Sequence, residues 1–183
     1  MTRVVNVFNL DMDGVIVDLD SEFERLCQVH LGLEGKLADC SWERRWKMWE
    51  DLGDNRKDMF LHAKPFNYAD QLVKEILTFC DNAGYKLSIL TALPHAGHIA
   101  MAEEDKREWL DRYLPELSNH RFKLGPYSGD KWKHCLNKND ILLDDSSSNV
   151  FDWNIKGNGR GILHKNIPLS ISIIKELNTN IQE

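Results

Sequence analysis

The sequence predicts an α/β fold, a three-layer Rossmann-like architecture with helices on both faces of a parallel sheet. Three observations indicate it. Short apolar stretches with strand character alternate with amphipathic, helix-like stretches along most of the chain. The first apolar stretch is nearly continuous, which is typical of a strand buried on both faces. Polar clusters follow several apolar stretches, at the positions where open α/β sheets bind their ligands.

The elements are expected in the following order. The first strand is expected over residues 3–10 and the first helix over residues 21–31. Further strands are expected over residues 86–91, 121–124, 140–144 and 161–164. Further helices are expected over residues 68–82, 97–113, 149–156 and 169–178, with a helical turn or two at 131–136. Gly84 is placed to end the helix before it in a left-handed conformation.

Residues 33–66 differ in composition, because tryptophans and methionines are mixed there with many charges. Ser41 is placed to cap a helix that runs to Leu52, and a second short helix is expected over residues 56–62. We interpret residues 18–67 as a small helical cap inserted after the first strand. Residues 1–17 and 68–183 are then the α/β core.

The bulk composition limits the classes of function. The chain has 183 residues, 42% of them hydrophobic, and a formal net charge of −6. An acidic protein is a poor partner for a nucleic-acid duplex, whose phosphates need a basic surface. No apolar run is long enough to span a membrane, and no secretory signal is recognisable. The four cysteines are scattered, so we expect free thiols, a cytoplasmic protein and no membrane partner.

Two acidic pairs suggest a metal site. Asp11 and Asp13 end the first strand, and Gly14 permits a sharp turn that lets both face one pocket. Asp144 and Asp145 follow a later strand. Like charges repel by roughly 4 kcal/mol per pair at 4 Å in an effective dielectric near 20, so such a cluster needs counter-charges. Mg²⁺ is the expected cofactor, because it prefers hard oxygen ligands such as carboxylates and phosphates.

These residue types suit the hydrolysis of a phosphomonoester. An ionised Asp11 is a candidate nucleophile toward phosphorus, giving an aspartyl-phosphate. Asp13 is the candidate general acid for the departing alkoxide and the general base for the water that cleaves the intermediate. Lys131 neutralises charge on the transferring group. The Thr91 hydroxyl and the following backbone N–H, that of Ala92, are candidates to hold phosphate oxygens.

Each of these features also has a purely structural interpretation. A DxD segment is most often a loop or a helix cap, Thr91 can end a strand, and Lys131 can start a solvated helix. Asp144 and Asp145 can cap the helix that follows them. Four such features in the right order after the right elements rarely coincide by chance, which favours the catalytic interpretation.

The motifs resemble those of the haloacid dehalogenase (HAD) superfamily. They are DMDGVIVD after the first strand, SILTALP, GDK, and ILLDDSSSN. The resemblance implies a HAD-like core, and it implies a phosphatase rather than a dehalogenase because the second aspartate of the first motif is present. It further implies that Asp11, the main-chain carbonyl of Asp13 and Asp144 hold the metal, with Asp145 as a supporting carboxylate.

Within that superfamily the chain is most similar to the 5′(3′)-deoxyribonucleotidases and their bacterial and phage relatives. The likeness extends to MFLHAKPFNYAD, to EDKREWLDRYL and to DK before LLDD. In that family a small helical cap covers the substrate. Some positions depart from the pattern: Leu19 replaces an aromatic residue, Ala92-Leu93 stands where Ser-Pro is frequent, and Gly129 and Ser146 replace arginines. These changes remove stacking and phosphate contacts but leave the phosphatase chemistry intact.

Aromatic and histidine residues near the expected pocket have more than one interpretation. Trp42, Trp46 and Trp49 share one face of the expected cap helix and either pack the cap or form a stacking wall for a base. Trp42 and Trp46 are therefore candidate substrate contacts. His95 and His98 follow the second motif, where a surface loop, a substrate contact and a metal are open alternatives.

The sequence thus predicts a Mg²⁺-dependent 5′-nucleotidase-like phosphatase whose partner is a small phosphorylated substrate, with a deoxyribonucleoside monophosphate favoured. Three alternatives stay open: another small phosphorylated metabolite, a 3′-phosphorylated nucleic-acid end, and a catalytically silent phosphate-binding module. A homodimer is compatible with the sequence.

Overall fold

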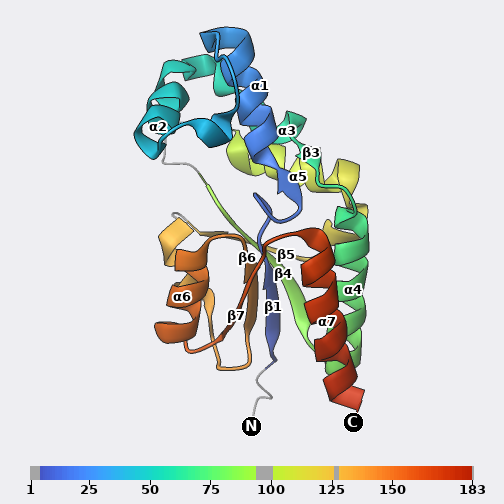
Figure 1. Cartoon of the computed structure of the whole chain (residues 1–183). Coiled ribbons are helices and arrows are strands. Elements are labelled where there is room, and N and C mark those ends of the chain that lie inside the picture. Colours follow the sequence, from blue (N-terminus) through green and yellow to red (C-terminus); the bar gives the residue numbers. More distant parts are fainter. Residues whose placement is uncertain (1–4, 94–100, 126–127, 183) are drawn as a thin grey trace.

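A five-stranded parallel sheet forms the centre of the molecule (Figure 1). The computed structural model describes residues 5–93, 101–125 and 128–182. The strands are β1 (Val7–Leu10), β4 (Lys86–Ala92), β5 (Arg121–Gly125), β6 (Ile141–Asp144) and β7 (Arg160–Leu163), in the spatial order β5-β4-β1-β6-β7. Because β1 lies at the centre, with β4 and β6 paired to it in parallel, the ends of three strands meet at one edge.

Helices cover both faces of this sheet. On one face α4 (Ala69–Ala83) and α7 (Ile167–Gln182) lie side by side, and α5 (Ala102–Tyr113) contributes to the same core (Figure 1). On the opposite face lie α6 (Ser147–Ile155) and the 3₁₀ helix η4 (Ser128–His134), which contact each other. The predicted three-layer architecture is therefore confirmed.

Alternation along the strands distributes side chains between the two faces. Phe8 and Leu10 of β1 enter the large core beneath α4 and α7, while Leu142 of β6 packs with Trp153 of α6 on the other side. Side chains also alternate in direction at the ends of the strands. The residues that follow β1 and β6 can therefore contact side chains from the helices on either face of the sheet.

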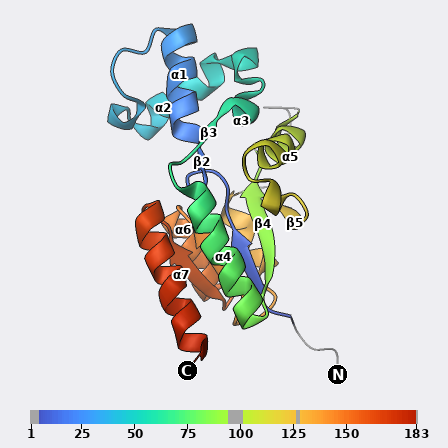
Figure 2. The ribbon, with the colours of Figure 1, turned by 90° about the vertical axis from the view of Figure 1, so that its right-hand side faces the viewer.

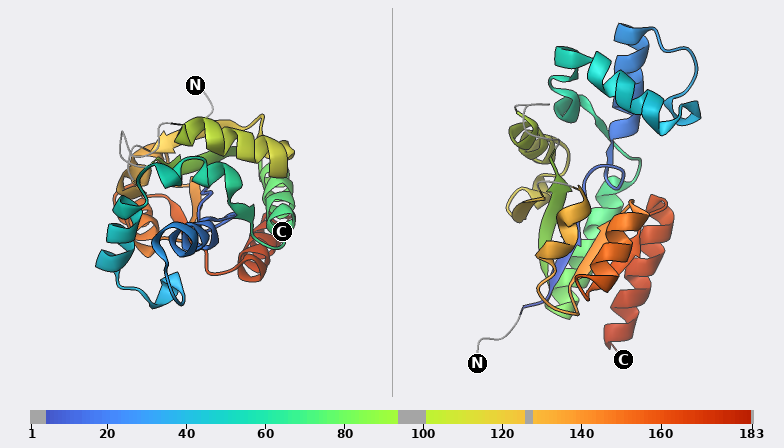
Figure 3. Two further views of the ribbon diagram at one scale, coloured as in Figure 1. Left: turned by 90° about the horizontal axis from the view of Figure 1, so that it is seen from above. Right: turned by 90° about the vertical axis from the view of Figure 1, so that its left-hand side faces the viewer.

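The chain between β1 and α4 forms a helical insertion, which we define as residues 19–62. It lies beyond the carboxyl ends of the strands (Figures 2 and 3). Its helices are α1 (Leu19–Leu31), η1 (Leu37–Asp39), α2 (Trp42–Asp51), η2 (Gly53–Arg56) and α3 (Met59–His62). Phe23, Leu26, Met48 and Phe60 are among the buried residues of its own apolar cluster.

Two short strands and one core helix connect this insertion to the rest of the molecule. Strands β2 (Val17–Asp18) and β3 (Lys64–Pro65) pair antiparallel at its base, a pairing that the sequence did not indicate. Helix α5 contacts α3, and the indole N–H of buried Trp109 donates to the carbonyl of Ala63 at 2.8 Å. Helix α5 is thus shared between the sheet and the insertion.

Most element predictions are confirmed, with shifts at the ends. Ser41 caps α2 by accepting from the N–H of Arg44, and Gly84 ends α4 with a φ of 70°. The helix predicted over residues 56–62 is wrong in its first half, where η2 ends at Arg56 and α3 begins at Met59. His95, His98 and the start of the helix expected from residue 97 lie outside the described residues. Among the described residues, none of the helices combines the length and apolarity that a membrane span requires.

Asp140 lies at the end of the sheet that is remote from the insertion, and its hydrogen bonds hold that end together. Its fully buried carboxylate accepts from the backbone N–H groups of Val7, Leu136 and Asn137 and from the Asn137 side-chain amide, at 2.8–3.2 Å. It thereby ties β1 to the loop before β6.

Replacing Asp140 with Ala should lower the free energy of unfolding by about 3 kcal/mol, because several partly buried donors lose this acceptor. Urea denaturation followed by circular dichroism measures this. The matched control is Asp152→Ala, which removes an accessible pair with Lys156 and should cost under about 0.5 kcal/mol. Equal effects of the two substitutions would contradict this role of Asp140.

Candidate active site

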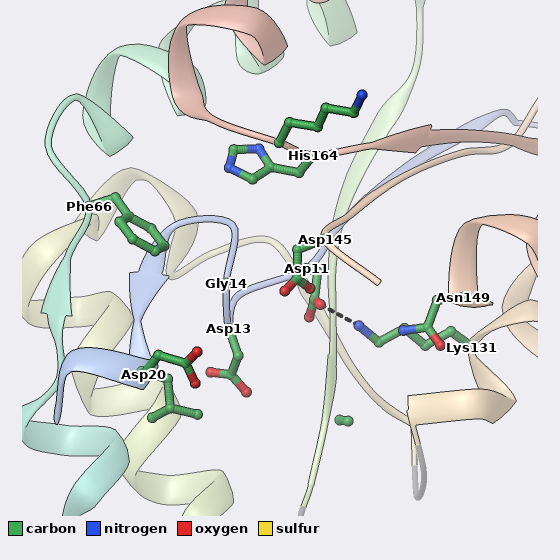
Figure 4. A pocket seen from close by; sticks show the side chains of 12 residues that line it. Asp11, Asp13, Gly14, Asp20, Phe66, Lys131, Asp145, Asn149 and His164 are labelled. Carbon is green, nitrogen blue, oxygen red and sulfur yellow. Dashed lines mark ion pairs between the residues drawn. The ribbon is translucent and has the colours of Figure 1, made fainter. Parts of the chain in front are cut away.

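A tight loop after β1 brings Asp11 and Asp13 to the edge of the sheet. The carbonyl of Met12 accepts three N–H groups, those of Val15, Ile16 and Val17, at 2.9–3.2 Å. This folds the chain back so sharply that the side chains on either side of Met12 line the same pocket (Figure 4).

Gly14 is required in this loop for two reasons. Its φ of +74° is a left-handed conformation that side chains disfavour, and a Cβ there would overlap the carboxylate of Asp145. Asp145 therefore packs directly against the β1 loop, although the residue as a whole is exposed. The first and fourth sequence motifs meet at this contact.

Lys131 joins the two strand ends electrostatically. Its Nζ lies 2.6 Å from Asp11 Oδ2 and 2.7 Å from Asp144 Oδ2, and the side chain is 2% exposed. Burial alone would lower the pKa of this ammonium, but attraction to Asp11 and Asp144 outweighs it and the pKa is raised. The lysine therefore stays charged, and the structural alternative of a solvated helix start is excluded.

Asp144 is held by several donors besides Lys131. The backbone N–H of Ser146 donates to its Oδ1 at 2.8 Å, and the amide of buried Asn149 lies 3.1 and 3.2 Å from its two oxygens. The α6 N-terminus is capped by Ser146, whose hydroxyl accepts from the N–H of Asn149. Asp144 is thus fixed in orientation, but it is not the helix cap.

The carboxylates fit a divalent cation. One oxygen each of Asp11, Asp144 and Asp145 lies within 4.8 Å of the others. Burial raises the pKa of Asp11 to about 7, with Asp144 and Asp13 adding to the effect and Lys131 opposing it. Burial of its carboxyl, with repulsion from Asp144, raises the pKa of Asp145 to about 6. Three carboxylates facing one ammonium keep two negative charges when ionised, which a Mg²⁺ ion would neutralise.

Thr91 and Ala92, at the end of β4, lie beside a second buried cation that the sequence interpretation missed. Lys106 of α5 is 1% exposed, and its Nζ donates to Asp13 Oδ2 at 2.5 Å, Thr91 Oγ1 at 2.7 Å and the Ala92 carbonyl at 2.9 Å. Ala92 lines the pocket, whereas Thr91 is fully buried beneath it.

These polar groups surround a cavity of about 520 Å³, a size typical of small-molecule sites. Phe66 and Leu19 give it an apolar wall, and Arg45 holds the rim residue Asp20 at 2.8 Å. Figure 4 shows Asp13, Asp11 and Asp145 gathered between Phe66 on one side and Lys131 on the other. The lining residues are Asp11, Asp13, Gly14, Leu19, Asp20, Phe66, Ala92, Lys131, Asp145, Asn149, His164 and Lys165.

The tryptophans of α2 lie away from this cavity. Trp42 is 70% exposed and Trp46 is 40% exposed, their rings are 6.1 Å apart, and neither is among the lining residues described. Trp49 instead packs edge-on against Phe23 within the insertion. Trp49 agrees with the cap-packing interpretation, and a substrate contact of Trp42 or Trp46 stays a prediction.

Lys106, Asn149 and His164 are among the polar residues of the site that the sequence interpretation missed. Lys106 lies in a helix rich in charged residues, and no sequence signal distinguished it from a solvated lysine. His164 is buried at the end of β7, where its Nδ1 lies 2.8 Å from Ser170 Oγ and burial lowers its pKa. A neutral imidazole therefore lines the cavity.

Comparison with solved structures supports the fold. A hydrolase from Streptococcus pneumoniae TIGR4 matches with a TM-score of 0.51 and 10% identity, covering 93% of this chain and 98% of its own. CbbY from Rhodobacter sphaeroides, solved in complex with phosphate, matches with a TM-score of 0.51 and 14% identity, covering 89% and 87%. A HAD hydrolase of family IA, variant 3, from Entamoeba histolytica HM-1:IMSS covers 94% and 100% at 13% identity and a TM-score of 0.46.

No protein-family model matches the sequence, and no curated protein does. At these low identities the structural likeness establishes the fold alone. It confirms the predicted three-layer, Rossmann-like α/β fold class, in which a parallel five-stranded sheet lies between helices.

The acidic cluster predicts a pH-dependent stabilisation by Mg²⁺. Asp11 and Asp145 have folded-state pKa values raised above the usual 3.8, so they favour the ion-free folded state when protonated. That contribution is complete below about pH 4 and is lost as the pH rises through about 6 to 7. Mg²⁺ binds the ionised carboxylates, so the melting temperature should rise more on adding Mg²⁺ at about pH 7.5 than at about pH 5.

Thermal denaturation with MgCl₂ or EDTA at the two pH values measures this difference. At a Mg²⁺ concentration 100 times Kd the stabilisation should be about 2.7 kcal/mol. Asp145→Asn should reduce the shift, whereas Asp152→Asn, outside the cluster, should preserve it. A shift of the same size at both pH values, or in both variants, would argue against a site built from these carboxylates.

Proposed function

We propose that this protein is a HAD-type phosphatase, a Mg²⁺-dependent phosphomonoester hydrolase that acts through an aspartyl-phosphate on Asp11. The observation that carries the proposal is the meeting of Asp11, Asp144 and Asp145 around Lys131 at the floor of a cavity. The ordered sequence motifs and the phosphate complex of the structural neighbour CbbY give further support.

The residues of this chain divide the reaction between them. An oxygen of Asp11 forms a bond to phosphorus as the bond between phosphorus and the leaving oxygen breaks, and Asp13 gives that oxygen a proton. Asp13 then takes a proton from a water molecule whose oxygen attacks phosphorus, which releases inorganic phosphate and restores Asp11. Lys131 neutralises negative charge beside the transferring group.

Asp11, the carbonyl of Asp13 and Asp144 would hold Mg²⁺, with Asp145 supporting them. When bound, the ion would neutralise negative charge on the phosphoryl oxygens. The raised pKa values of Asp11 and Asp145 support this assignment, because they mark a cluster with unbalanced negative charge. The Thr91 hydroxyl and the Ala92 N–H are the proposed phosphate donors.

We further propose a deoxyribonucleoside monophosphate as the substrate, with residues 18–67 acting as the cap over it. Phe66 offers an aromatic face in the cavity, on which a base or another ring can stack. Leu19 and Asp20, which begin the insertion, line the same cavity, so the insertion contributes to the recognition of the leaving group. The resemblance to deoxyribonucleotidases in sequence favours the nucleotide over other phosphorylated metabolites.

Asp11→Asn should abolish phosphatase activity, lowering kcat/KM by at least about a thousandfold, because an amide cannot form the acyl-phosphate bond. The variant should remain folded and be at least as stable as the parent near pH 7, since it relieves repulsion within the cluster. Release of inorganic phosphate with Mg²⁺ or EDTA measures activity, and circular dichroism measures folding. Full turnover by a folded Asp11→Asn protein would reject the mechanism.

A substrate panel distinguishes the proposed nucleotide from its alternatives. Deoxyribonucleoside 5′- and 3′-monophosphates should exceed sugar phosphates and 3′-phosphorylated oligonucleotides in kcat/KM. A higher kcat/KM for a sugar phosphate would agree with phosphatase activity but would reject a nucleotide as the preferred substrate. Phosphate binding without hydrolysis of any ester, including an aryl phosphate, would indicate a silent binding module.

A further inference from the structure

His164 lies in the wall of the cavity and is held in place by a strand and a helix. Its backbone N–H donates to the carbonyl of Asp144 at 2.8 Å, which fixes it beside the end of β6. Its ring Nδ1 lies 2.8 Å from the hydroxyl oxygen of Ser170, near the start of α7. The side chain is only 7% exposed, and it lines the cavity. The imidazole is therefore a preorganised group on rigid elements.

The Ser170 hydroxyl determines which ring nitrogen carries the hydrogen. Ser170 is 1% exposed, and Nδ1 is the hydrogen-bond partner that the described residues give its hydroxyl. If Nδ1 carried the only ring hydrogen, the hydroxyl oxygen would accept it, and the O–H hydrogen would be buried without an acceptor. The hydroxyl therefore donates to Nδ1, and the ring hydrogen is on Nε2. An imidazolium would also carry a hydrogen on Nε2, so this donor is present in either charge state.

Nε2 is the ring nitrogen that remains available to a ligand. Within the described ranges it has no hydrogen-bond partner, and it is not one of the fully buried side-chain atoms that lack one. It therefore keeps contact with open space, and the open space beside His164 is the cavity. Figure 4 shows the ring on the Phe66 side of Asp145, away from Lys131.

The position of this donor indicates which part of a substrate it can reach. Under the proposed function, the phosphoryl group lies against Asp11 and Lys131. Phe66 and His164, on the other side of the cavity, then face the leaving group. A largely buried N–H that meets no acceptor costs binding energy, so this wall favours a leaving group with an oxygen over a purely apolar one.

We propose that His164 is a specificity-determining residue whose Nε2–H donates a hydrogen bond to an oxygen of the leaving group, an inference that rests on the proposed phosphatase function. The substrate class is then a phosphomonoester whose leaving group combines an oxygen acceptor with a face that packs on Phe66. In a deoxyribonucleoside monophosphate, a carbonyl oxygen of the base and an oxygen of the sugar both have this chemistry. His164 keeps its hydrogen throughout the reaction.

Long-range ¹H–¹⁵N correlation NMR tests the donor directly and requires no turnover. At about pH 8, where an ordinary imidazole is neutral, we expect the His164 ring of the parent protein to be the Nε2–H tautomer. The His164 signals are assigned by their absence in His164→Gln. Ser170→Ala removes the constraint, so the Nδ1–H tautomer should become populated. A parent ring with its hydrogen on Nδ1 would overturn the inference.

Three esters that differ in their oxygen acceptors test the donor in the reaction. Deoxythymidine 5′-monophosphate has acceptors on the base and the sugar, 1,2-dideoxyribose 5-phosphate has them on the sugar alone, and cyclopentylmethyl phosphate has neither. In His164→Met, kcat/KM for the nucleotide should fall about 3- to 10-fold relative to kcat/KM for cyclopentylmethyl phosphate, the value of one hydrogen bond. A parallel fall for the sugar phosphate would identify a sugar oxygen as the acceptor. A fall for the nucleotide alone would identify a base oxygen.

Two further variants control for lost packing. His164→Gln, whose side-chain amide offers an N–H near the position of Nε2, should restore part of the ratio. His120→Met changes a histidine that precedes β5, at the opposite end of the sheet and outside the cavity lining, and should leave the ratio unchanged. The ratio is independent of the fraction of protein that is folded, so partial misfolding of a variant does not obscure the result.

The outcomes separate this inference from the proposed function. Equal losses on all three esters in His164→Met, with weaker inhibition by inorganic phosphate, would place the donor on the phosphoryl group and overturn the inference. Kinetics of His164→Met that match those of the parent protein on every ester would overturn it as well. Failure of the parent protein to hydrolyse the nucleotide would instead reject the proposed function, and the tautomer measurement distinguishes the two failures.

Discussion

The structure depends on the compensation of like charges crowded at one edge of the sheet. Asp11, Asp13, Asp144 and Asp145 come from two neighbouring parallel strands and cannot be moved apart without unpairing them. Lys131 compensates part of this charge from one face, and Lys106 does so from the other. The remaining negative charge is what the proposed divalent cation would neutralise.

This constraint explains why the surrounding elements are placed as they are. Helix α5 must reach the strand ends to deliver Lys106, and in doing so it also packs against α3 of the insertion. The insertion is therefore connected to the carboxylate of Asp13, the proposed general acid, through Lys106 and the ring of Phe60. Helix α5 therefore takes part both in balancing the charge at the strand ends and in holding the insertion beside the cavity.

The sequence predicted those parts of the molecule whose signals are local. The apolar run of β1, the cap at Ser41 and the stop at Gly84 each depend on neighbouring residues and are confirmed. The motif residues Asp11, Lys131 and Asp144 converge because parallel strands must end at the same edge. Lys106 was missed because a lysine within a charged helix looks solvated until the fold buries it. The exposure of Trp42 was missed because helical spacing does not specify where neighbouring elements end.

In the proposed reaction Asp11 becomes covalently phosphorylated within this charge-balanced cluster. Rapid acid quenching of the protein during turnover with Mg²⁺, followed by peptide mass spectrometry, tests it directly. We expect the added mass of one phosphoryl group on the peptide that contains Asp11, and we expect it to disappear when the substrate is exhausted. Steady turnover with no modified peptide, or with the phosphoryl group on another residue, would contradict an aspartyl-phosphate on Asp11.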